Sequence, residues 1–178
     1  NLSDKTICVE TDAQVINNHY AYGRYVITVY FPNNTTLFTG KNLCKYENGQ
    51  IWKEENYKDG KLDGKGTWWH ENGRKDQEGN YVDGELDSKF TWWYENGQKR
   101  GEENYTDGKK DDGKQTWWHE SGRIRKEVNF KDGKMHGKLI EWNKNGQIKE
   151  EEIYKNGDLV NKSLFKYYEN NQIESEEN

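Results

Sequence analysis

The chain contains few of the residues that interrupt β-structure or cross membranes. Among its 178 residues there is one proline, Pro32, so proline removes almost no backbone donor from a β-ladder. No apolar run approaches the roughly 18 residues of a membrane-spanning helix, and we expect no transmembrane segment. No secretory signal peptide is recognisable in the N-terminal residues, which begin with Asn1 rather than Met.

Cysteine is also scarce, because Cys8 and Cys44 are the only two. In a secreted protein they would form a disulfide that ties the N-terminal segment to the region around residue 44. In a cytosolic protein they would remain two thiols. The sequence leaves both possibilities open, although a secreted or periplasmic location is slightly favoured.

Aliphatic residues are too few for a thick globular core. Only 30% of the chain is hydrophobic and 33% is charged, a balance that is typical of disordered chains. However, 14% of the residues are aromatic, including eight Trp and twelve Tyr, and these bury much apolar area per residue. A thin structure rich in aromatic side chains fits this composition. The net charge of -5 lacks the basic footprint of nucleic-acid-binding proteins, so we expect no nucleic acid partner.

From residue 39 onward the sequence repeats with a period of about 24 residues. Two turn sequences mark each repeat. The first, Asn-Gly or a near variant, ends at Gly49, Gly73, Gly97, Gly122 and Gly146, and the second, Asp-Gly or Asn-Gly, ends at Gly60, Gly84, Gly108, Gly133 and Gly157. A fixed period predicts stacked supersecondary units that present a surface, whereas catalysis needs one singular arrangement of residues. We therefore expect no enzymatic activity, no catalytic residues and no cofactor.

Each Asn-Gly lies between aromatic or alternating segments, which predicts a β-hairpin with a two-residue type I′ turn. The predicted fold is all-β: an elongated single antiparallel sheet of tandem β-hairpin repeats. The array covers residues 39–178, with five repeats and a truncated sixth. Residues 1–38 do not repeat and are predicted to form a partly β N-terminal cap, since repeat arrays need atypical ends that cover their edges. A separate functional surface in this segment is the alternative.

A two-residue turn fixes the pairing outward from it. It places Trp93 opposite Arg100 and Trp118 opposite Arg125, with cation–π contacts in reach. Further from the turn, it places glycines opposite aromatic residues, which lets a ring lie over bare backbone. These predicted pairs are Gly64 with Tyr81, Gly113 with Phe130, and Gly137 with Tyr154.

The same register predicts two unlike faces, because side chains alternate along a strand. The more apolar, buried face should hold Trp68, Trp92, Trp117, the Tyr or His residues 46, 70, 94 and 119, the strand-end aromatics 57, 81, 105, 130 and 154, and Ile51, Ile124, Ile148 and Ile173. The more polar face should hold Trp69, Trp93, Trp118, Trp142 and Tyr167, together with Glu54, Glu78, Glu102, Glu127, Glu151 and Glu176.

Segments such as Tyr-Glu-Asn-Gly-Gln at Tyr46–Gln50 and Tyr94–Gln98, and Asn56–Lys65, resemble MORN repeats. They are most similar to the bacterial MORN variant that occurs in arrays and is sometimes labelled as antitoxin. The resemblance covers residues 39–178 and departs at Ser88, at Asn171 and at an insertion near Asp111-Asp112. It implies a sheet of successive hairpins and a role in binding or scaffolding, with any catalysis confined to attached domains.

The aromatic residues on the polar face are the best candidates for a partner-binding site. The predicted set is Trp69, Trp93, Trp118, Trp142, Tyr167, Arg100 and Arg125, since Trp, Tyr and Arg dominate binding energies at interfaces. The alternative is that these residues only stabilise a thin sheet through cross-strand pairs.

Other polar patterns have structural interpretations. The regularly spaced glutamates are expected to pair with neighbouring Lys or Thr, and not to form a metal track. The Asp-rich turns lack the ligand order of a calcium loop, and turn chemistry explains them. His70 and His119 occupy a position that Tyr46 and Tyr94 also occupy, which indicates packing and not metal binding or catalysis. We expect no metal site.

The predicted function is non-enzymatic recognition of a protein partner by the repeat-sheet surface, such as neutralisation of a toxin or a secreted interaction. A lipid or membrane-surface binding module is the first alternative, although the acidic balance disfavours anionic membranes. Carbohydrate or choline binding by exposed aromatics is the second. The protein is expected to be a monomer or an edge-to-edge dimer.

Overall fold

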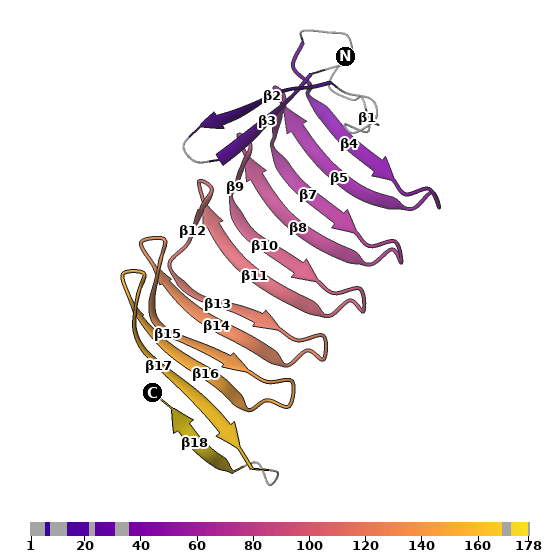
Figure 1. The fold of residues 1–178 in the computed structure, drawn as a ribbon. Helices are drawn as coiled ribbons and strands as arrows, with labels where there is room; N and C mark the ends of the chain where they lie inside the picture. The colour runs from indigo at the N-terminus through magenta and orange to yellow at the C-terminus, as the bar shows by residue number, and fades with distance from the viewer. Residues whose placement is uncertain (1–5, 8–13, 22–23, 31–35, 169–171, 178) are drawn as a thin grey trace. The chain divides into compact units, whose positions relative to one another are not determined.

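The computed structural model describes residues 6–7, 14–21, 24–30, 36–168 and 172–177, the first three ranges by their backbone alone (Figure 1). Every regular element among these residues is a β-strand. The chain divides into two compact units, residues 1–90 and 91–178, and the boundary falls inside β10 (Ser88–Trp93). The predicted all-β fold of tandem antiparallel hairpins is confirmed. The predicted boundary between cap and array, after residue 38, stays a prediction.

The first unit is built from hairpins whose strands pair in sequence order. Its strands are β1 (Thr6–Ile7), β2 (Gln14–Ala21), β3 (Arg24–Tyr30), β4 (Gly40–Lys45), β5 (Ile51–Lys58), β6 (Lys61–Leu62), β7 (Gly64–Trp69), β8 (Lys75–Val82) and β9 (Glu85–Leu86). The order in the sheet is β1-β4-β5-β7-β8, with β6 paired to β5 and β9 paired to β8. β2 and β3 form a separate antiparallel pair. β1 pairs with β4 in parallel.

The second unit continues the same pattern. Its strands are β11 (Lys99–Thr106), β12 (Lys109–Lys110), β13 (Gly113–Trp118), β14 (Ile124–Lys131), β15 (Lys134–Trp142), β16 (Ile148–Lys155), β17 (Asp158–Tyr167) and β18 (Ile173–Glu177). The order is β11-β13-β14-β15-β16-β17-β18, with β12 paired to β11. The long strands of this unit therefore lie side by side. Equivalent residues of successive repeats lie on different strands, so each repeated position forms a row across the strands.

The Asn-Gly turns are three-residue loops, and the predicted two-residue type I′ turn is wrong. The Gly73 N–H donates to the His70 carbonyl at 2.9 Å, and the His70 N–H donates to the Arg74 carbonyl at 2.8 Å. Gly73 has a φ of 79°, while Asn72 is not among the residues with positive φ. Asn72 is favoured for another reason, because its Oδ1 accepts the Arg74 N–H at 2.9 Å.

A β-bulge follows these loops, as between β7 and β8 and between β13 and β14, and it changes the pairing beside the turn. Trp117 pairs with Lys126 and Trp118 with Ile124, so Arg125 is the extra residue of the bulge. The predicted pairing of Trp118 with Arg125 is therefore wrong. The loop shifts the pairing by one residue and the bulge shifts it back. For that reason the outer pairs were predicted correctly: Gly64 with Tyr81, Gly113 with Phe130 and Gly137 with Tyr154.

The two-residue turns with positive φ at both positions occur at the second turn sequence. Asp83 has a φ of 52° and Gly84 a φ of 89°, as a type I′ turn requires. The Gly84 N–H also donates to the Leu62 carbonyl at 2.7 Å, which joins this turn to the preceding repeat. The Asp-Gly turns therefore close a hairpin and link successive repeats.

Residues directly opposite each other share a face of the sheet, and this separates two faces in each unit. The face that holds Cys44, Trp68 and Trp117 is here called the packed face, and it holds the buried hydrophobic residues. These are Phe38, Cys44, Tyr57 and Phe90 in the first unit and Val128 and Leu139 in the second. The face that holds Glu54, Glu78 and Glu127 is called the ladder face.

The isoleucine row lies on the ladder face, contrary to the prediction. Ile124 pairs with Trp118, Ile148 with Trp142 and Ile173 with Tyr167. Ile51 pairs with Lys45 in the same way. The bulge after each loop moves this row to the face opposite the one that a two-residue turn would give.

Aromatic rings on the packed face lie over glycines, although not over the predicted ones. A Cβ on Gly79 would overlap Cδ2 of Phe90, and one on Gly101 would lie 2.7 Å from Cδ1 of Trp117. Nothing lies within 4 Å of the equivalent atom on Gly113. Gly113 is favoured by its φ of 110°, which side chains rarely adopt, although Ser88 has a φ of 82° at the equivalent position.

Candidate functional site

The ladder face of each unit carries glutamates at one repeated position, and five of them pair with lysines. The pairs are Glu54 with Lys41 at 2.9 Å, Glu78 with Lys65 at 3.0 Å and Lys75 at 2.5 Å, Glu102 with Lys99 at 2.7 Å, Glu127 with Lys114 at 2.8 Å, and Glu151 with Lys138 at 2.7 Å. The predicted Glu–Lys pairing is confirmed at these five positions.

At Glu78 the pairing also affects the carboxyl's titration. Burial by itself would raise the pKa of Glu78, but the hydrogen bonds from Lys75 and Lys65 hold it below its usual value. The carboxylate is therefore charged near neutral pH and is neutralised by residues of the chain itself.

The predicted aromatic residues are half-buried and occupy one repeated position on the ladder face of each unit, and this set of residues is here called the tryptophan stripe. It consists of Trp69, Trp93, Trp118, Trp142 and Tyr167. Lys99 Nζ lies 5.4 Å from the centre of the Trp118 ring, so this ring has a lysine partner and not the predicted arginine. Half-burial fixes an indole ring while part of its surface stays accessible. Partner binding by this stripe stays a prediction.

A shallow hollow lies beside Trp69 on the ladder face. It encloses about 210 Å³ and is lined by Glu54, Asn56, Lys65, Thr67, Trp69, Lys75 and Glu78. Asn56 Nδ2 donates to the Lys65 carbonyl at 2.8 Å. The hollow therefore combines one indole with paired charges and an amide, which are groups that can contact a mixed polar and apolar partner.

The two arginines of the predicted site lie away from the tryptophan stripe. Arg100 Cζ lies 5.9 Å from the centre of the Tyr94 ring. The bulge residues of other repeats also contact residues of the packed side: Trp52 lies against Tyr46, and Lys149 Nζ lies 3.3 Å from Glu141. We therefore assign Arg100 and Arg125 to the packed face, because the bulge turns this position away from the stripe.

The position shared by Tyr and His links a hairpin to the next one at Tyr46, Tyr94 and His119. Tyr46 Oη donates to the Trp69 carbonyl at 2.6 Å, and Tyr94 Oη donates to the Trp118 carbonyl at 2.8 Å. His119 Nε2 lies 2.9 Å from the Trp142 carbonyl and is the donor there, since a carbonyl only accepts. Tyr and His exchange here because both present a donor at similar reach.

Tyrosines at the strand ends bind carboxylates two residues earlier on the packed face. The Tyr57 hydroxyl donates to Glu55 at 3.3 Å and the Tyr154 hydroxyl to Glu152 at 2.8 Å, and Tyr105 contacts Glu103 in the same way. Sequence reasoning missed this link. One clue was available: the fourth repeat has Val128 and Phe130, so hydroxyl and carboxylate are absent together.

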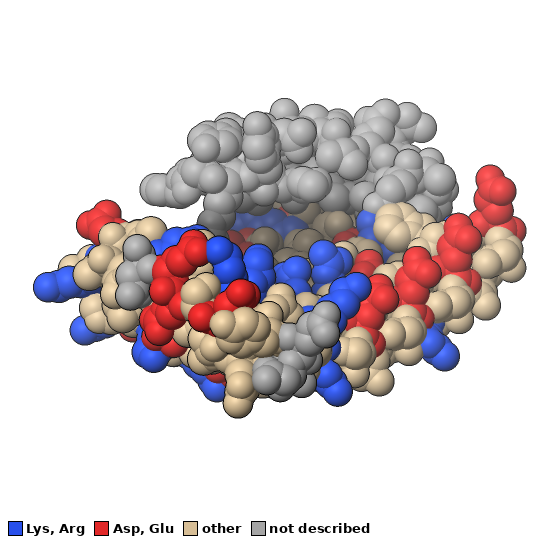
Figure 2. All heavy atoms as spheres, turned by 60° about the horizontal axis from the view of Figure 1, so that its bottom comes forward, with Lys and Arg blue, Asp and Glu red and all other residues tan. Residues whose placement is uncertain are grey.

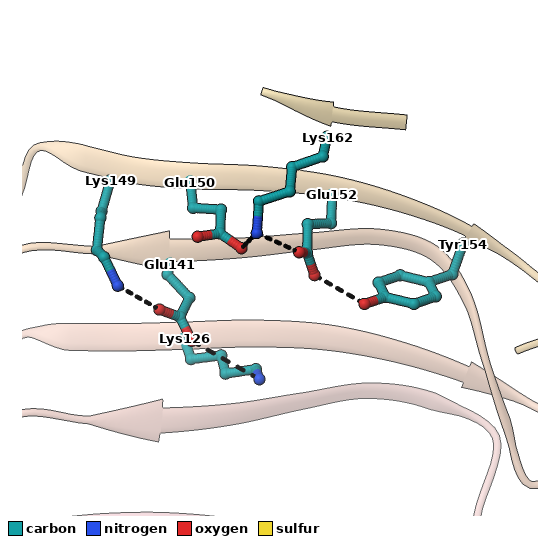
Figure 3. A network of polar contacts seen from close by, with 7 residues as sticks. All are labelled: Lys126, Glu141, Lys149, Glu150, Glu152, Tyr154 and Lys162. Atoms are coloured by element: carbon teal, nitrogen blue, oxygen red, sulfur yellow. Dashed lines mark hydrogen bonds and ion pairs between the residues drawn. The ribbon is translucent and has the colours of Figure 1, made fainter. Parts of the chain in front are cut away.

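A polar network extends this link in the second unit (Figure 3). Lys162 Nζ contacts Glu150 at 2.6 Å and Glu152 at 2.9 Å. Glu141 contacts Lys149 at 3.3 Å and Lys126 at 3.7 Å. Burial would raise the pKa of Glu152, but hydrogen bonds from Lys162 and Tyr154 hold it below its usual value. The hydrogen bond to Glu152 in turn raises the pKa of Tyr154.

Gln115 is a buried amide without a partner in the part of the chain that the structure describes. Its side chain lies on the packed face, it is 3% exposed, and neither Nε2 nor Oε1 has a hydrogen bond among those residues. The equivalent position is Phe90 in the preceding repeat and Leu139 in the next, so an apolar side chain fits there. An unpaired buried amide costs stability, which makes this residue a candidate for ligand contact.

Cys44 is 1% exposed in β4, with Sγ 3.4 Å from Oδ1 of Asn42. Its predicted disulfide partner, Cys8, lies outside the described residues, so that pairing stays a prediction.

Among the described residues, no group of three or more His, Cys, Asp or Glu side chains is arranged to hold a metal ion. That same part of the chain contains no helix long and apolar enough to cross a membrane.

The repeats match a known family. The family described as MORN repeat variant matches residues 38–59, 62–83, 86–107, 111–132 and 135–156. These five segments follow one another along the chain, and each contains the first turn of its repeat and ends one residue before the glycine of the second turn. A search of curated proteins found no match to the chain.

Proposed function

Because the chain belongs to the MORN repeat variant family, whose repeats commonly mediate binding or scaffolding, we propose that it recognises a protein partner without catalysing a reaction. The tryptophan stripe is the recognition surface. The observation that carries this proposal is the half-burial of the stripe residues at one repeated position. Packing holds the rings rigidly, and rigid aromatic anchors contribute most to affinity when they enter a partner's pockets.

The surroundings of the stripe support specific recognition. Next to Trp69 the hollow presents an indole between Lys–Glu pairs, which resembles an apolar anchor with a polar rim. The pairs are internally neutral, so they favour no strongly charged partner. An indole surrounded by neutral Lys–Glu pairs is therefore better suited to binding a folded protein surface than to binding a charged polymer.

The test is a pull-down from extract and culture medium of the source cell. We would compare the parent with a Trp69→Ala, Trp93→Ala, Trp118→Ala variant. A matched control removes exposed apolar side chains outside the stripe: Val82→Ala, Leu159→Ala, Val160→Ala. Circular dichroism checks that all three proteins are folded. We expect a partner that the parent and the control capture and the stripe variant loses. Equal capture by all three would overturn the stripe as the recognition surface.

The two alternative ligands are examined with the same variants. Flotation with neutral and anionic vesicles tests lipid binding. Titration of tryptophan fluorescence with choline and glycans tests carbohydrate or choline binding by the exposed aromatic residues. Binding in either assay that the stripe variant loses, together with no captured protein, would replace the proposal.

Toxin neutralisation is the specific form of this function that the resemblance to antitoxin-labelled arrays favours. A toxin captured by the parent should stop growth when it is expressed alone. Co-expression of the parent should restore growth, and co-expression of the stripe variant should not. A captured protein without any effect on growth would leave recognition in place and remove the toxin assignment.

A further inference from the structure

The packed face of the second unit carries more positive charge than its carboxylates neutralise. Lys110 pairs with Glu103 at 2.8 Å, and the lysines of the Figure 3 network pair with Glu141, Glu150 and Glu152. Arg100 and Arg125 are exposed and have no ion pair among the described residues. Figure 2 shows lysine and arginine side chains close together on the surface that it draws, next to aspartate and glutamate side chains.

The two arginines repeat with the spacing of the sheet. Arg125 is the bulge residue of β14, Arg100 is the equivalent residue of β11, and β13 is the strand between them. Neighbouring strands are about 4.8 Å apart, so equivalent positions two strands apart are separated by about 9.6 Å. A ligand that forms the same ion pair with each arginine would carry negative groups separated by about this distance.

An extended proline-rich peptide has this interval. A polyproline II helix has three residues per turn and rises about 3.1 Å per residue, so every third side chain lies on one side at intervals of about 9.3 Å. Such helices dock on aromatic surfaces. Here Trp117 lies directly opposite Gly101, with Trp92 on the other side of that glycine. The two indoles therefore lie beside the arginines and offer such a surface.

Gln115 adds a second, independent observation. The backbone of a polyproline II helix makes no internal hydrogen bonds, so its carbonyls need donors. Gln115 is two residues from Trp117 on the same face of β13, with both amide atoms unpaired among the described residues. A peptide carbonyl that inserts beside Trp117 would receive the Gln115 amide hydrogen.

We propose that the packed face of the second unit binds an acidic, proline-rich segment of a partner protein, with Arg100 and Arg125 pairing with acidic side chains at every third position and Gln115 binding its backbone. This surface is separate from the tryptophan stripe. Peptide binding can therefore fail while the stripe's function stands, and the reverse also holds.

The test uses the full chain and a fluorescein-labelled peptide of four Glu-Pro-Pro repeats, with affinity measured by fluorescence anisotropy. Peptides with Gln or Lys in place of Glu, and one with its glutamates clustered at one end, are the ligand controls. We expect the regularly spaced acidic peptide to bind most tightly, and its binding to weaken as salt screens the charges. If the clustered peptide bound as tightly as the regularly spaced one, the proposed spacing of acidic groups would be wrong. If the Gln peptide bound as tightly, the proposed pairing of arginines with acidic side chains would be wrong.

Two variants test the residues. Arg100→Ala, Arg125→Ala should weaken binding about tenfold or more, because each loses a charge-assisted hydrogen bond. The matched control, Lys114→Ala, Lys138→Ala, removes the same charge from the ladder face of the same unit and should bind like the parent. Equal weakening by both variants would overturn the assignment of the site to the packed face.

Gln115→Leu separates ligand contact from a merely structural role. Leucine occupies the equivalent position at residue 139, so the variant should fold and melt at a higher temperature than the parent. It should nevertheless bind the acidic peptide several-fold more weakly. A lower melting temperature, or unchanged peptide affinity, would remove Gln115 from the site.

Discussion

The carboxylates on the two faces of the sheet differ in their burial and in their partners. On the ladder face the carboxylates pair with lysines that are about half exposed, such as Lys114 with 56% of its side chain accessible. On the packed face, Glu103 and Glu152 are nearly buried and are held by tyrosine hydroxyls as well as lysines. The ladder-face carboxylates thus form solvated pairs with lysines, whereas Glu103 and Glu152 on the packed face are each held by more than one side chain. A change on the packed face should therefore cost more than the same change on the ladder face.

The largest difference should come from adding one methyl group at Gly101. Its Cβ would lie 2.7 Å from Trp117, and Trp92 closes the other side at 3.3 Å, so Gly101→Ala forces an indole to move. We expect a loss of about 2–3 kcal/mol in the free energy of unfolding, measured by denaturant titration. The neighbouring change Glu102→Ala on the ladder face should cost less than about 1 kcal/mol. Similar losses for the two variants would contradict tight packing over this glycine.

Two adjacent glutamates give the sharpest test of the charge difference. Glu151→Ala removes one ladder pair, with an exposed Lys138, and should change stability by about 0.5 kcal/mol. Glu152→Ala removes the partner of Lys162 and Tyr154 and should cost about 1–2 kcal/mol, because the tyrosine hydroxyl loses its acceptor. Both values come from denaturant titration at neutral pH. The reverse order would show that the network adds nothing to the single pairs.

The smallest effect should appear in the pH dependence of stability. The folded-state pKa values of Glu78 and Glu152 are below the ordinary value of 4.5. Each carboxylate therefore contributes stability above about pH 4.5 that is lost as the pH falls through the depressed value. Each group should account for about 0.5 kcal/mol. Glu78→Gln and Glu152→Gln should each flatten the acid limb of a plot of melting temperature against pH, and an unchanged slope would contradict the pairing.

Much of the fold was predictable because it follows from period and turn chemistry. The spacing of Gly73, Gly97 and Gly122 fixed the repeat, and the aromatic residues indicated order in a chain otherwise rich in charge. The outer pairs, such as Gly64 with Tyr81, were correct even though the turn type was not. A three-residue loop followed by a bulge returns to the register that a two-residue turn gives, so the outer pairs do not distinguish between them.

The candidate site was predicted less well for the same physical reason. Inside the bulge, side chains change face, so Arg100 and Arg125 were assigned to the tryptophan stripe and Ile124 to the packed face. Links between repeats were also missed, such as the bond from Tyr94 to the Trp118 carbonyl. A hydrogen bond to a backbone carbonyl places no requirement on residue type at the acceptor, so the sequence carries little trace of it.

By itself, the sequence determined the repeat, the hairpins and the alternating carboxylates and lysines, because these depend on local conformational preference and on a side-chain period of two. Only the tertiary structure decided which turn takes positive φ at both residues, as Asp83 and Gly84 do while Asn72 does not. It also decided that Gln115 lies buried without a partner among the described residues. These features depend on contacts between neighbouring repeats, such as the Gly84 N–H bound to the Leu62 carbonyl, which local preference cannot specify.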